Sequence, residues 1–231
     1  MYNNTKINVL VATIPERIGG LKKVVNSILP QVDMLQVYLN GHKEIPDFLY
    51  HNKIKVIRST DTREGDMGDT GKFYRVDLLE GYILTIDDDL EYDKNYVNIM
   101  IEAIERYKRK CVISLHGRVL KERPIENYYK DFERYYRCLD GTNEDAQVHI
   151  VGTGVTAYHS DTLKIDHNKF RTGYCADIWF SIQCQQQNVP CIVIKNNGKL
   201  VENIKEVCYI KNIYEKHCKN NFLAELINAN K

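Results

Sequence analysis

Residues 82–97 read YILTIDDDLEYDKNYV, and this stretch decides the fold class. A short apolar run of strand length ends in three consecutive carboxylates, Asp87, Asp88 and Asp89, and a helical pattern follows. Adjacent like charges repel one another, so an ordered protein usually keeps them where a cation binds. A parallel strand ends at the carboxyl edge of its sheet, where open α/β folds bind ligands. The stretch therefore predicts a cation site at that edge.

Apolar runs of strand length alternate with helical patterns through the first half of the chain. Strands are expected at residues 7–12, 35–39, 54–57, 82–86 and 111–115, and helices through 13–30, through 71–80 and from Asp93 onward. Thr13 and Glu16 form a capping-box pattern with Pro15 in the first turn, and Asp93 is the expected N-cap of its helix. This alternation predicts an α/β fold with a mostly parallel central sheet and helices on both faces.

The second half of the chain is less regular. It predicts a strand interrupted by a Gly-Thr-Gly turn at 148–159, a helix at 176–188 and a strand at 191–194. The tyrosine-rich residues 127–140 favour a helix packed on the core over a rim that stacks on a sugar ring. No internal repeat, low-complexity tract or linker interrupts the sequence. We therefore expect a single domain.

Composition narrows the class of protein. The 231 residues are 43% hydrophobic, which is enough for a substantial core, and 32 basic against 31 acidic residues leave a net charge of +1. This balance argues against nucleic acid as a partner and against a polybasic membrane anchor. The N-terminus lacks a signal-peptide pattern, and no apolar run approaches the roughly 20 residues that span a bilayer. The 7 cysteines form no CxxC pair, so we expect reduced thiols, no zinc site and a soluble cytoplasmic protein.

The acidic triplet offers only oxygen ligands. Such ligands suit Mg²⁺ or Mn²⁺, and a nucleotide diphosphate would complete the coordination shell. Because strand side chains alternate, Asp87 and Asp89 should share a side and Asp88 should oppose them. The alternatives are a solvated acidic turn that caps the next helix, and a haloacid-dehalogenase-type phosphatase. The phosphatase pattern is disfavoured because Glu91 stands where those enzymes have a small residue, and because three predicted strands come first.

Several stretches, in this order, carry a family resemblance: ATIPER, SILPQVDMLQVYLN followed by EIP, GDTGKF, ILTIDDDLEYDKNYV, ISLHG, VGTG and ADIWFS. Through them, over about residues 9–194, the chain resembles the GT-A superfamily of nucleotide-sugar glycosyltransferases. More narrowly, it resembles the bacterial α-N-acetylglucosaminyltransferases that build heparosan capsule chains. The resemblance implies a GT-A (Rossmann-like) domain over 1–231. Its nucleotide-binding half would cover about 1–115 and its acceptor-side half about 116–195. The resemblance fades past residue 195, so the tail at 196–231 has two alternatives, a further contact to metal or phosphate and a lid that orders with the donor bound.

The resemblance also implies which residues hold the donor. The turn after the first strand would cup the uridine, and further residues would lie beside the base and the phosphates; these are Ala12, Thr13, Pro15, Arg17, Asn40 and Lys72. Within the triplet, Asp89 would be the firmest metal ligand, Asp87 would contact ribose or metal, and Asp88 would lie at the donor. The implied cofactor is Mn²⁺ (or Mg²⁺), and the implied donor is a UDP-sugar.

On the acceptor side, the resemblance points to Asp177, which would face the acceptor or the reacting sugar. An inverting enzyme would use a carboxylate there as the base, whereas a retaining one would use it to orient the acceptor or to stabilise an oxocarbenium-like sugar. The alternative is an N-cap for the following helix. Backbone amides of Gly152, Thr153 and Gly154 would approach the sugar, unless these residues form an ordinary turn. His116 and Gly117 end a strand at the same edge, where the histidine is more often structural.

The expected activity is metal-dependent transfer of N-acetylglucosamine from UDP-GlcNAc, with retention, onto a growing polysaccharide or another glycan. The alternatives are a sugar nucleotidyltransferase and a non-catalytic glycan-binding subunit of a polymerase complex. A capsule-type role implies a peripheral position at the inner membrane face, beside other glycan-synthesis enzymes. Lys211, Lys216 and His217 are weaker candidates for a further contact to metal or phosphate.

Overall fold

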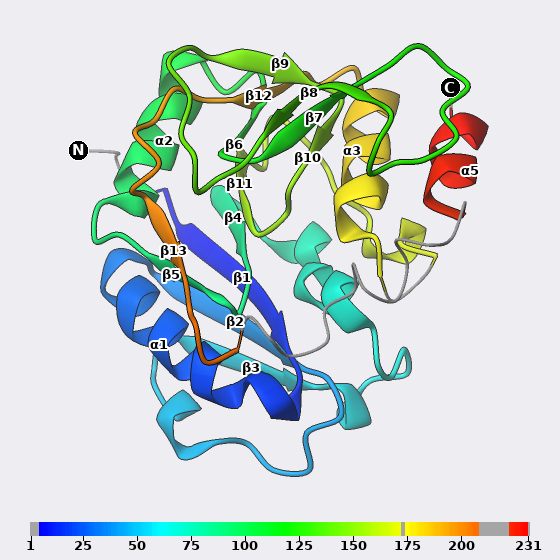
Figure 1. Cartoon of the computed structure of the whole chain (residues 1–231). Coiled ribbons are helices and arrows are strands. Elements are labelled where there is room, and N and C mark those ends of the chain that lie inside the picture. The colour runs from blue at the N-terminus through cyan, green and yellow to red at the C-terminus, as the bar shows by residue number, and fades with distance from the viewer. Residues whose placement is uncertain (1–4, 172–173, 208–221, 231) are drawn as a thin grey trace.

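The structure, a computed structural model, describes residues 5–171, 174–207 and 222–230. An eight-stranded sheet of order β3-β2-β1-β4-β11-β6-β12-β9 forms its centre (Figure 1). The strands are β1 Ile7–Thr13, β2 Met34–Leu39, β3 Ile54–Arg58, β4 Tyr82–Ile86, β6 Val112–Ser114, β9 Ala146–Val148, β11 Val155–His159 and β12 Cys191–Val193. All except β9 and β11 run parallel to one another, which confirms the predicted mostly parallel sheet.

Helices cover both faces of this sheet. Helices α1 (Ile18–Ile28) and α2 (Tyr96–Arg106) lie on one face, and α3 (Ala176–Gln186) and α5 (Phe222–Ala229) on the other (Figure 1). Successive residues of β1 serve the two cores in turn: Val9 and Val11 pack with α1 and α2, whereas Leu10 packs with α3. A strand buried on both faces needs apolar residues at every position, which is why these strands appear in the sequence as unbroken hydrophobic runs.

Two smaller sheets complete the fold. The antiparallel sheet β10-β7-β8 joins Ile150–Val151, Gly117–Leu120 and Phe132–Tyr136, and β10 packs against α3. The second small sheet pairs β5 (Leu90–Tyr92) with β13 (Val201–Asn203). Through β13, part of the predicted C-terminal tail is tied to the strand that directly follows the acidic triplet. Lys211, Lys216 and His217 lie outside the described residues.

Two predicted helices are wrong. In place of a helix over 71–80 there are two short 3₁₀ helices, η5 (Gly68–Phe73) and η6 (Val76–Leu78). Arg75 lies between them with φ 53°, a left-handed backbone that no α-helix continues through. The tyrosine-rich stretch contains β8 and not a helix, because its residues pair with β7 in an antiparallel ladder.

The starts of α1 and α2 also differ from the prediction. Strand β1 continues through Thr13, and Ile14 precedes the 3₁₀ turn η1 (Pro15–Arg17) without a side-chain cap, so no capping box forms. Helix α2 has Asn95 at its N-cap position, and Asp93 Oδ1 accepts a hydrogen bond from the Asn95 amide at 2.7 Å. Asp93 therefore stabilises the turn before the helix, and the N-cap is Asn95, two residues later than predicted.

The first and second halves of the sequence share one sheet. Strand β11, from the second half, lies between β4 and β6 of the first half and pairs with both. The five cysteines in the part of the chain that the structure describes are buried and free, in keeping with the predicted reduced thiols. Within the same residues, no helix combines the length and the apolar character that crossing a bilayer requires.

Glycine is required at one tight approach next to β4. Gly81 has φ +96°, and a Cβ there would lie 2.3 Å from the backbone oxygen of Lys6. We predict that Gly81→Ala lowers the free energy of unfolding by ~2 kcal/mol or more. Gly19, in α1, has nothing within 4 Å of the place that a Cβ would take, so Gly19→Ala should stabilise the protein by up to ~1 kcal/mol. Urea unfolding of both variants tests this, and equal effects would contradict it.

Candidate active site

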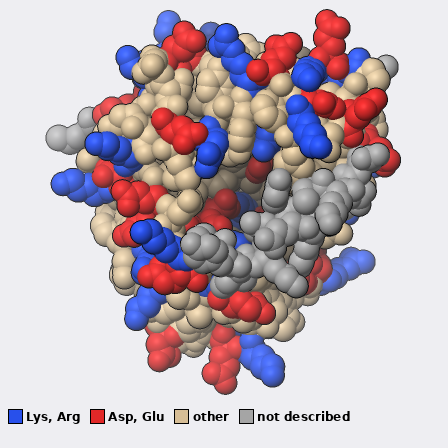
Figure 2. Space-filling view, in the orientation of Figure 1, with Lys and Arg blue, Asp and Glu red and all other residues tan. Residues whose placement is uncertain are grey.

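A cleft of about 840 Å³ opens where the carboxyl ends of β1, β2 and β4 face the first turn of α3. Figure 2 shows a hollow in the middle of this face, with acidic and basic side chains inside it. Most of the predicted site residues line the cleft; these are Ala12, Thr13, Arg17, Asn40, Lys72, Asp87, Asp88, Asp89, Thr153 and Asp177. Pro15, Gly152 and Gly154 are predicted site residues that do not line it.

Lys72 balances the first carboxylate of the triplet. Its Nζ lies 2.5 Å from Asp87 Oδ1, and its side chain is only 2% exposed, against 41% for Asp87. Burial by itself lowers the pKa of Lys72, but the ion pair with Asp87 and the nearby Asp69 outweigh burial and leave this pKa above its usual value. Lys72 is therefore a permanent positive charge in the floor of the cleft.

Arg17 balances the other two carboxylates. Its Nη1 donates to Asp88 Oδ1 at 2.9 Å and to Asp89 Oδ2 at 3.0 Å. Asp88 and Asp89 therefore contact the same nitrogen, so the expectation that Asp88 lies on the opposite side from Asp89 is wrong. Strand β4 ends at Ile86, so Asp88 and Asp89 lie in a turn where strand alternation no longer holds. Burial, and next the negative charge of the neighbouring Asp87, raise the pKa of Asp89 to about 6. Ionising Asp89 therefore costs free energy in the ligand-free cleft.

The arrangement of the triplet fits the implied Mn²⁺ or Mg²⁺. All three carboxylates line the cleft, but the side chains of Asp87 and Asp89 are 41% and 28% exposed, whereas that of Asp88 is only 6% exposed. Among the described residues, no group of three or more acidic, histidine or cysteine side chains is placed to hold an ion by itself. Two carboxylates suit an ion that keeps several waters and takes further oxygens from a diphosphate.

Asn40 holds the loop that carries the cleft's other charged residues. Its Oδ1 accepts from the Met67 amide at 3.0 Å, and its Nδ2 donates to the Gly68 oxygen at 2.8 Å. The loop continues directly into η5, which contains Asp69 and Lys72. Asn40 therefore positions Lys72 through the backbone, besides lining the cleft itself.

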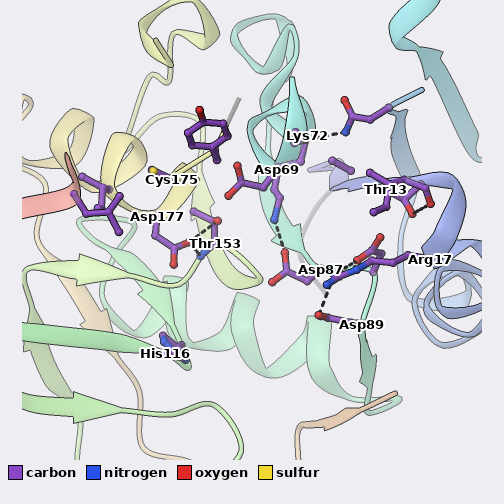
Figure 3. Close-up of a pocket in the computed structure, with 18 of the residues that line it drawn as sticks. Thr13, Arg17, Asp69, Lys72, Asp87, Asp89, His116, Thr153, Cys175 and Asp177 are labelled. Carbon is purple, nitrogen blue, oxygen red and sulfur yellow. Dashed lines mark hydrogen bonds and ion pairs between the residues drawn. The ribbon is translucent and has the colours of Figure 1, made fainter. Parts of the chain in front are cut away.

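Asp177 faces the triplet across the cleft (Figure 3). It lies in the first turn of α3, where Cys175 takes the N-cap position with φ 73°, so Asp177 is not the cap. Its Oδ1 accepts from both the amide and the hydroxyl of Thr153, each at 2.7 Å. Two hydrogen bonds to one oxygen fix the carboxylate, and its second oxygen has no hydrogen-bond partner in the part of the chain that the structure describes.

The glycines around Thr153 allow close internal packing. A Cβ at Gly154 would lie 2.0 Å from Asp87 Oδ2, and one at Gly152 would lie 2.8 Å from the ring of His116. The Gly152 amide donates to the His116 oxygen at 2.9 Å, and the Thr153 amide is used by Asp177. These two amides therefore act within the protein, and Gly154 lets the turn before β11 pack against Asp87.

Sequence reasoning missed two groups of cleft residues. The first is Asp69, whose Oδ2 accepts from the Ala176 amide at 3.2 Å while its Oδ1 is buried without a hydrogen-bond partner. Burial raises the pKa of Asp69 to about 7, although Lys72 opposes the shift. The stretch GDTGKF, which carries the family resemblance, already contained this residue beside Lys72. The second group is Arg118 with Tyr128, Tyr129 and Tyr135; only the less favoured alternative for residues 127–140, an aromatic rim, had pointed to these tyrosines.

Asp69 should make the stability of the ligand-free protein depend on pH. A carboxyl whose pKa is raised on folding costs nothing below its unfolded pKa near 3.8, and its cost grows until the pH exceeds about 7. We therefore predict that Asp69→Asn raises the free energy of unfolding at pH 8, on the order of 2 kcal/mol after allowance for partial exposure. The gain should be smaller at pH 5. Thermal unfolding at both pH values measures it, and a loss of stability at pH 8 would contradict the prediction.

Comparisons with known proteins link the chain to solved structures. No family model matches the sequence, and no curated protein matches it. The crystal structure of residues 1–349 of S. aureus TarS in complex with UDP-GlcNAc is similar, with a TM-score of 0.52 and 14% identity. This match covers 83% of our chain and 56% of that one. A second crystal structure of S. aureus TarS matches with a TM-score of 0.51 and 14% identity, over 83% of our chain and 35% of that one.

At this level of identity the likeness concerns the fold. The chain spans about half of the first TarS structure and about a third of the second. Over that span, the two proteins share the arrangement of a large, mostly parallel sheet with helices on both faces. The match confirms the predicted GT-A fold of this chain.

Proposed function

We propose that this chain is a metal-dependent glycosyltransferase that takes a sugar from a UDP-sugar and attaches it to a glycan acceptor. The observation that carries the proposal is the cleft itself. One wall holds three carboxylates with two paired cations at the end of β4, and the opposite wall holds the fixed carboxylate of Asp177. The likeness in fold to TarS, which was crystallised with UDP-GlcNAc, supports a nucleotide-sugar donor.

The charges of the donor wall suit a diphosphate only with an added cation. Asp87, Asp88 and Asp89 outnumber Arg17 and Lys72, so the wall by itself repels phosphate oxygens. We assign Asp87 and Asp89 as the protein ligands of Mn²⁺ (or Mg²⁺), which when bound neutralises the charge that develops on the departing UDP. Lys72 and Arg17 face the same diphosphate from the protein side. Ala12, Thr13, Pro15 and Asn40 complete the nucleotide site, by the family resemblance.

The transfer step exchanges one bond at the anomeric carbon. The bond from that carbon to the diphosphate oxygen breaks, and a bond to the acceptor hydroxyl oxygen forms on the same face of the sugar. The hydroxyl proton passes to the released diphosphate oxygen, and UDP leaves with its charge balanced by Lys72 and Arg17. The free oxygen of Asp177 stabilises the positive charge that develops on the sugar ring, or orients the acceptor.

The narrower form of the proposal rests on the resemblance to heparosan-type enzymes. It names N-acetylglucosamine as the sugar, an α linkage formed with retention, and a growing polysaccharide as the acceptor. Residues 1–115 would bind the nucleotide and residues 116–195 the acceptor, and the tail at 196–231 would close over them. The protein would then act with other glycan-synthesis enzymes at the cytoplasmic face of the membrane.

The first test replaces Asp89, one of the two proposed metal ligands. Wild-type protein with UDP-GlcNAc and Mn²⁺ should release UDP, and EDTA should abolish the release. Asp89→Asn should lower the rate by about 100-fold or more, since it removes a metal ligand. It should not lower the melting temperature, because one of three repelling charges is gone. Glu91→Gln is the matched control, as Glu91 is an exposed acid two residues away that does not line the cleft.

Three other outcomes would redirect the proposal. Wild-type turnover in Asp89→Asn would remove the triplet from the metal site. Pyrophosphate release from UTP and a sugar phosphate, without UDP release from UDP-sugars, would identify a nucleotidyltransferase. Calorimetry that shows no heat with UDP and Mn²⁺ would favour a non-catalytic subunit.

The second test concerns Asp177. Asp177→Asn should lower kcat by about 100-fold, because an amide stabilises positive charge on the sugar far less than a carboxylate does. The affinity for UDP should be unchanged, since Asp177 lies on the opposite wall from the triplet. Proton NMR of the product should show the α anomer. A β-linked product would contradict retention and would make Asp177 the base of an inverting enzyme.

A further inference from the structure

Tyr92 lies next to the acidic triplet but does not line the cleft. It ends β5, the strand that directly follows Asp89, and it is 3% exposed. Its hydroxyl accepts a hydrogen bond from the Asp87 amide at 2.8 Å and donates one to the Gly154 oxygen at 2.7 Å. A phenol has one proton to donate, and both partners are backbone groups, so these roles are fixed. One buried hydroxyl therefore joins the residue after β4 to the residue before β11.

Three packed elements hold Tyr92 in place. Its ring centroid lies 4.8 Å from that of Tyr96 on α2, and its backbone pairs with Val201 of β13. Its amide donates to Ser27 Oγ of α1 at 3.4 Å. A side chain that is enclosed in this way has little room to adjust, so the positions of its two hydrogen-bond partners are set together.

The two partners of the Tyr92 hydroxyl lead to opposite walls of the cleft (Figure 3). Asp87 is one of the two proposed metal ligands. Gly154 follows Thr153, which donates from both its amide and its hydroxyl to Asp177 Oδ1, each at 2.7 Å. A short series of hydrogen bonds and one peptide link therefore connects the two carboxylates. We call these five residues the Tyr92 connection.

The Tyr92 connection leaves no slack between the walls. A Cβ at Gly154 would lie 2.0 Å from Asp87 Oδ2, so atomic contact keeps the turn from moving closer to the triplet. The two hydrogen bonds of Tyr92 oppose movement in the other direction. Lys72 Nζ holds the remaining Asp87 oxygen at 2.5 Å. The separation of the walls is thus limited both ways at this point.

A buried tyrosine can also serve the core alone, and the neighbouring Tyr96 is such a residue. It is 0% exposed, and its hydroxyl has no hydrogen-bond partner in the part of the chain that the structure describes. Tyr92 differs because its hydroxyl satisfies two backbone groups at the carboxyl edge of the sheet. Packing of the ring accounts for neither of these contacts.

We propose that Tyr92 is a positioning residue for the sugar transfer. Its hydroxyl sets the distance between Asp87, which holds the ion and through it the diphosphate, and Asp177, which acts at the reacting sugar. Tyr92 itself touches neither donor nor acceptor. A misplacement of about 1 Å between such groups can lower a rate by about 100-fold. The inference rests on the proposed glycosyltransferase function and adds to it a residue outside the cleft.

The test replaces Tyr92 by phenylalanine in the full-length protein. UDP release from UDP-GlcNAc with Mn²⁺ gives kcat and KM for Tyr92→Phe. We expect kcat to fall by about 10-fold or more, because Asp177 no longer meets the sugar in the productive geometry. KM for UDP-GlcNAc and the affinity for Mn²⁺ should stay within about twofold of wild type, since Arg17, Lys72 and Asp89 keep their places.

Two further tyrosine-to-phenylalanine variants are the matched controls, because each also removes one buried hydroxyl. Tyr96→Phe removes a hydroxyl without a partner among the described residues. Tyr82→Phe acts at the opposite end of β4, where the hydroxyl donates to Glu105 Oε1 at 2.8 Å and accepts from Arg109 Nη2 at 3.2 Å. It should lower the melting temperature as Tyr92→Phe does, by about 2–6 °C. Both controls should keep the wild-type kcat.

A second readout measures the separation of the walls without turnover. With Co²⁺ in place of Mn²⁺ and saturating UDP, the pseudocontact shift of the Thr153 amide in NMR spectra reports its position relative to the ion. Tyr92→Phe should change this shift, whereas Tyr82→Phe and Tyr96→Phe should keep the wild-type value. A purely structural loss of stability would not move it.

Several outcomes would overturn the positioning role. These are equal kcat values in Tyr92→Phe and Tyr82→Phe, a raised KM with unchanged kcat, and a Thr153 shift that Tyr92→Phe leaves unchanged. If Tyr92→Phe does not fold, Thr153→Val replaces it, because this variant removes the hydroxyl contact to Asp177 in the same connection. It should show the same loss of kcat with KM retained, and a wild-type kcat would overturn the inference.

Failure of the inference is distinguishable from failure of the proposed function. A wild-type protein that neither binds nor releases UDP would contradict the proposed function, and the positioning role with it. An active wild type with an equally active Tyr92→Phe would contradict the positioning role alone.

Discussion

The balance of charge at the end of β4 is the constraint on which the site depends. Three carboxylates follow one another at Asp87, Asp88 and Asp89, and their repulsion is offset by Lys72 and Arg17 at 2.5 to 3.0 Å. The cation that such a triplet requires is thus supplied in part from within the protein. The remaining negative charge has no partner among the described residues, and it is the charge that the proposed divalent ion would neutralise.

The fold brings these charges together from distant parts of the sequence. Lys72 comes from η5, Arg17 from the turn after β1, and Asp177 from α3. Tyr92 links the two walls, because its hydroxyl accepts from the Asp87 amide at 2.8 Å and donates to the Gly154 oxygen at 2.7 Å. Backbone and buried side chains, more than surface contacts, therefore set the distance between the two walls of the cleft.

Much of the fold was predictable from the sequence, for a physical reason. Strands buried on both faces must be apolar throughout, so β1, β2, β4 and β12 stand out as hydrophobic runs, and the triplet marks where one of them ends. Most predicted donor residues lie in one cleft because the carboxyl ends of parallel strands meet at one edge. The prediction of a helix over 71–80 was wrong because Arg75 adopts a left-handed backbone conformation there. Arginine is a common helix residue, so its identity does not indicate this conformation.

The rest of the site depends on contacts that no local pattern carries. Asp69 becomes notable only through the burial of its Oδ1, which the packing of η5 against α3 creates. Arg118 is the one charged residue of β7, and no neighbour in the sequence marks it as a site residue. The tyrosines around it lie 10 or more positions further along the chain. The tyrosine-rich stretch suits a packed helix when read by itself, and only its pairing with β7, a tertiary contact, makes residues 132–136 a strand.

The position of β11 limits how this fold can be recombined. This strand crosses from the second half of the chain into the middle of the sheet and hydrogen-bonds along the whole of β4. A fragment that stopped near residue 115 would leave the edge of β4 without its neighbour and expose an apolar strand that readily pairs with other chains. A chimaera that joined the first half of this chain to a foreign second half would have to reproduce the register of that one strand. Substitutions within the β10-β7-β8 sheet leave β11 in place and avoid this constraint.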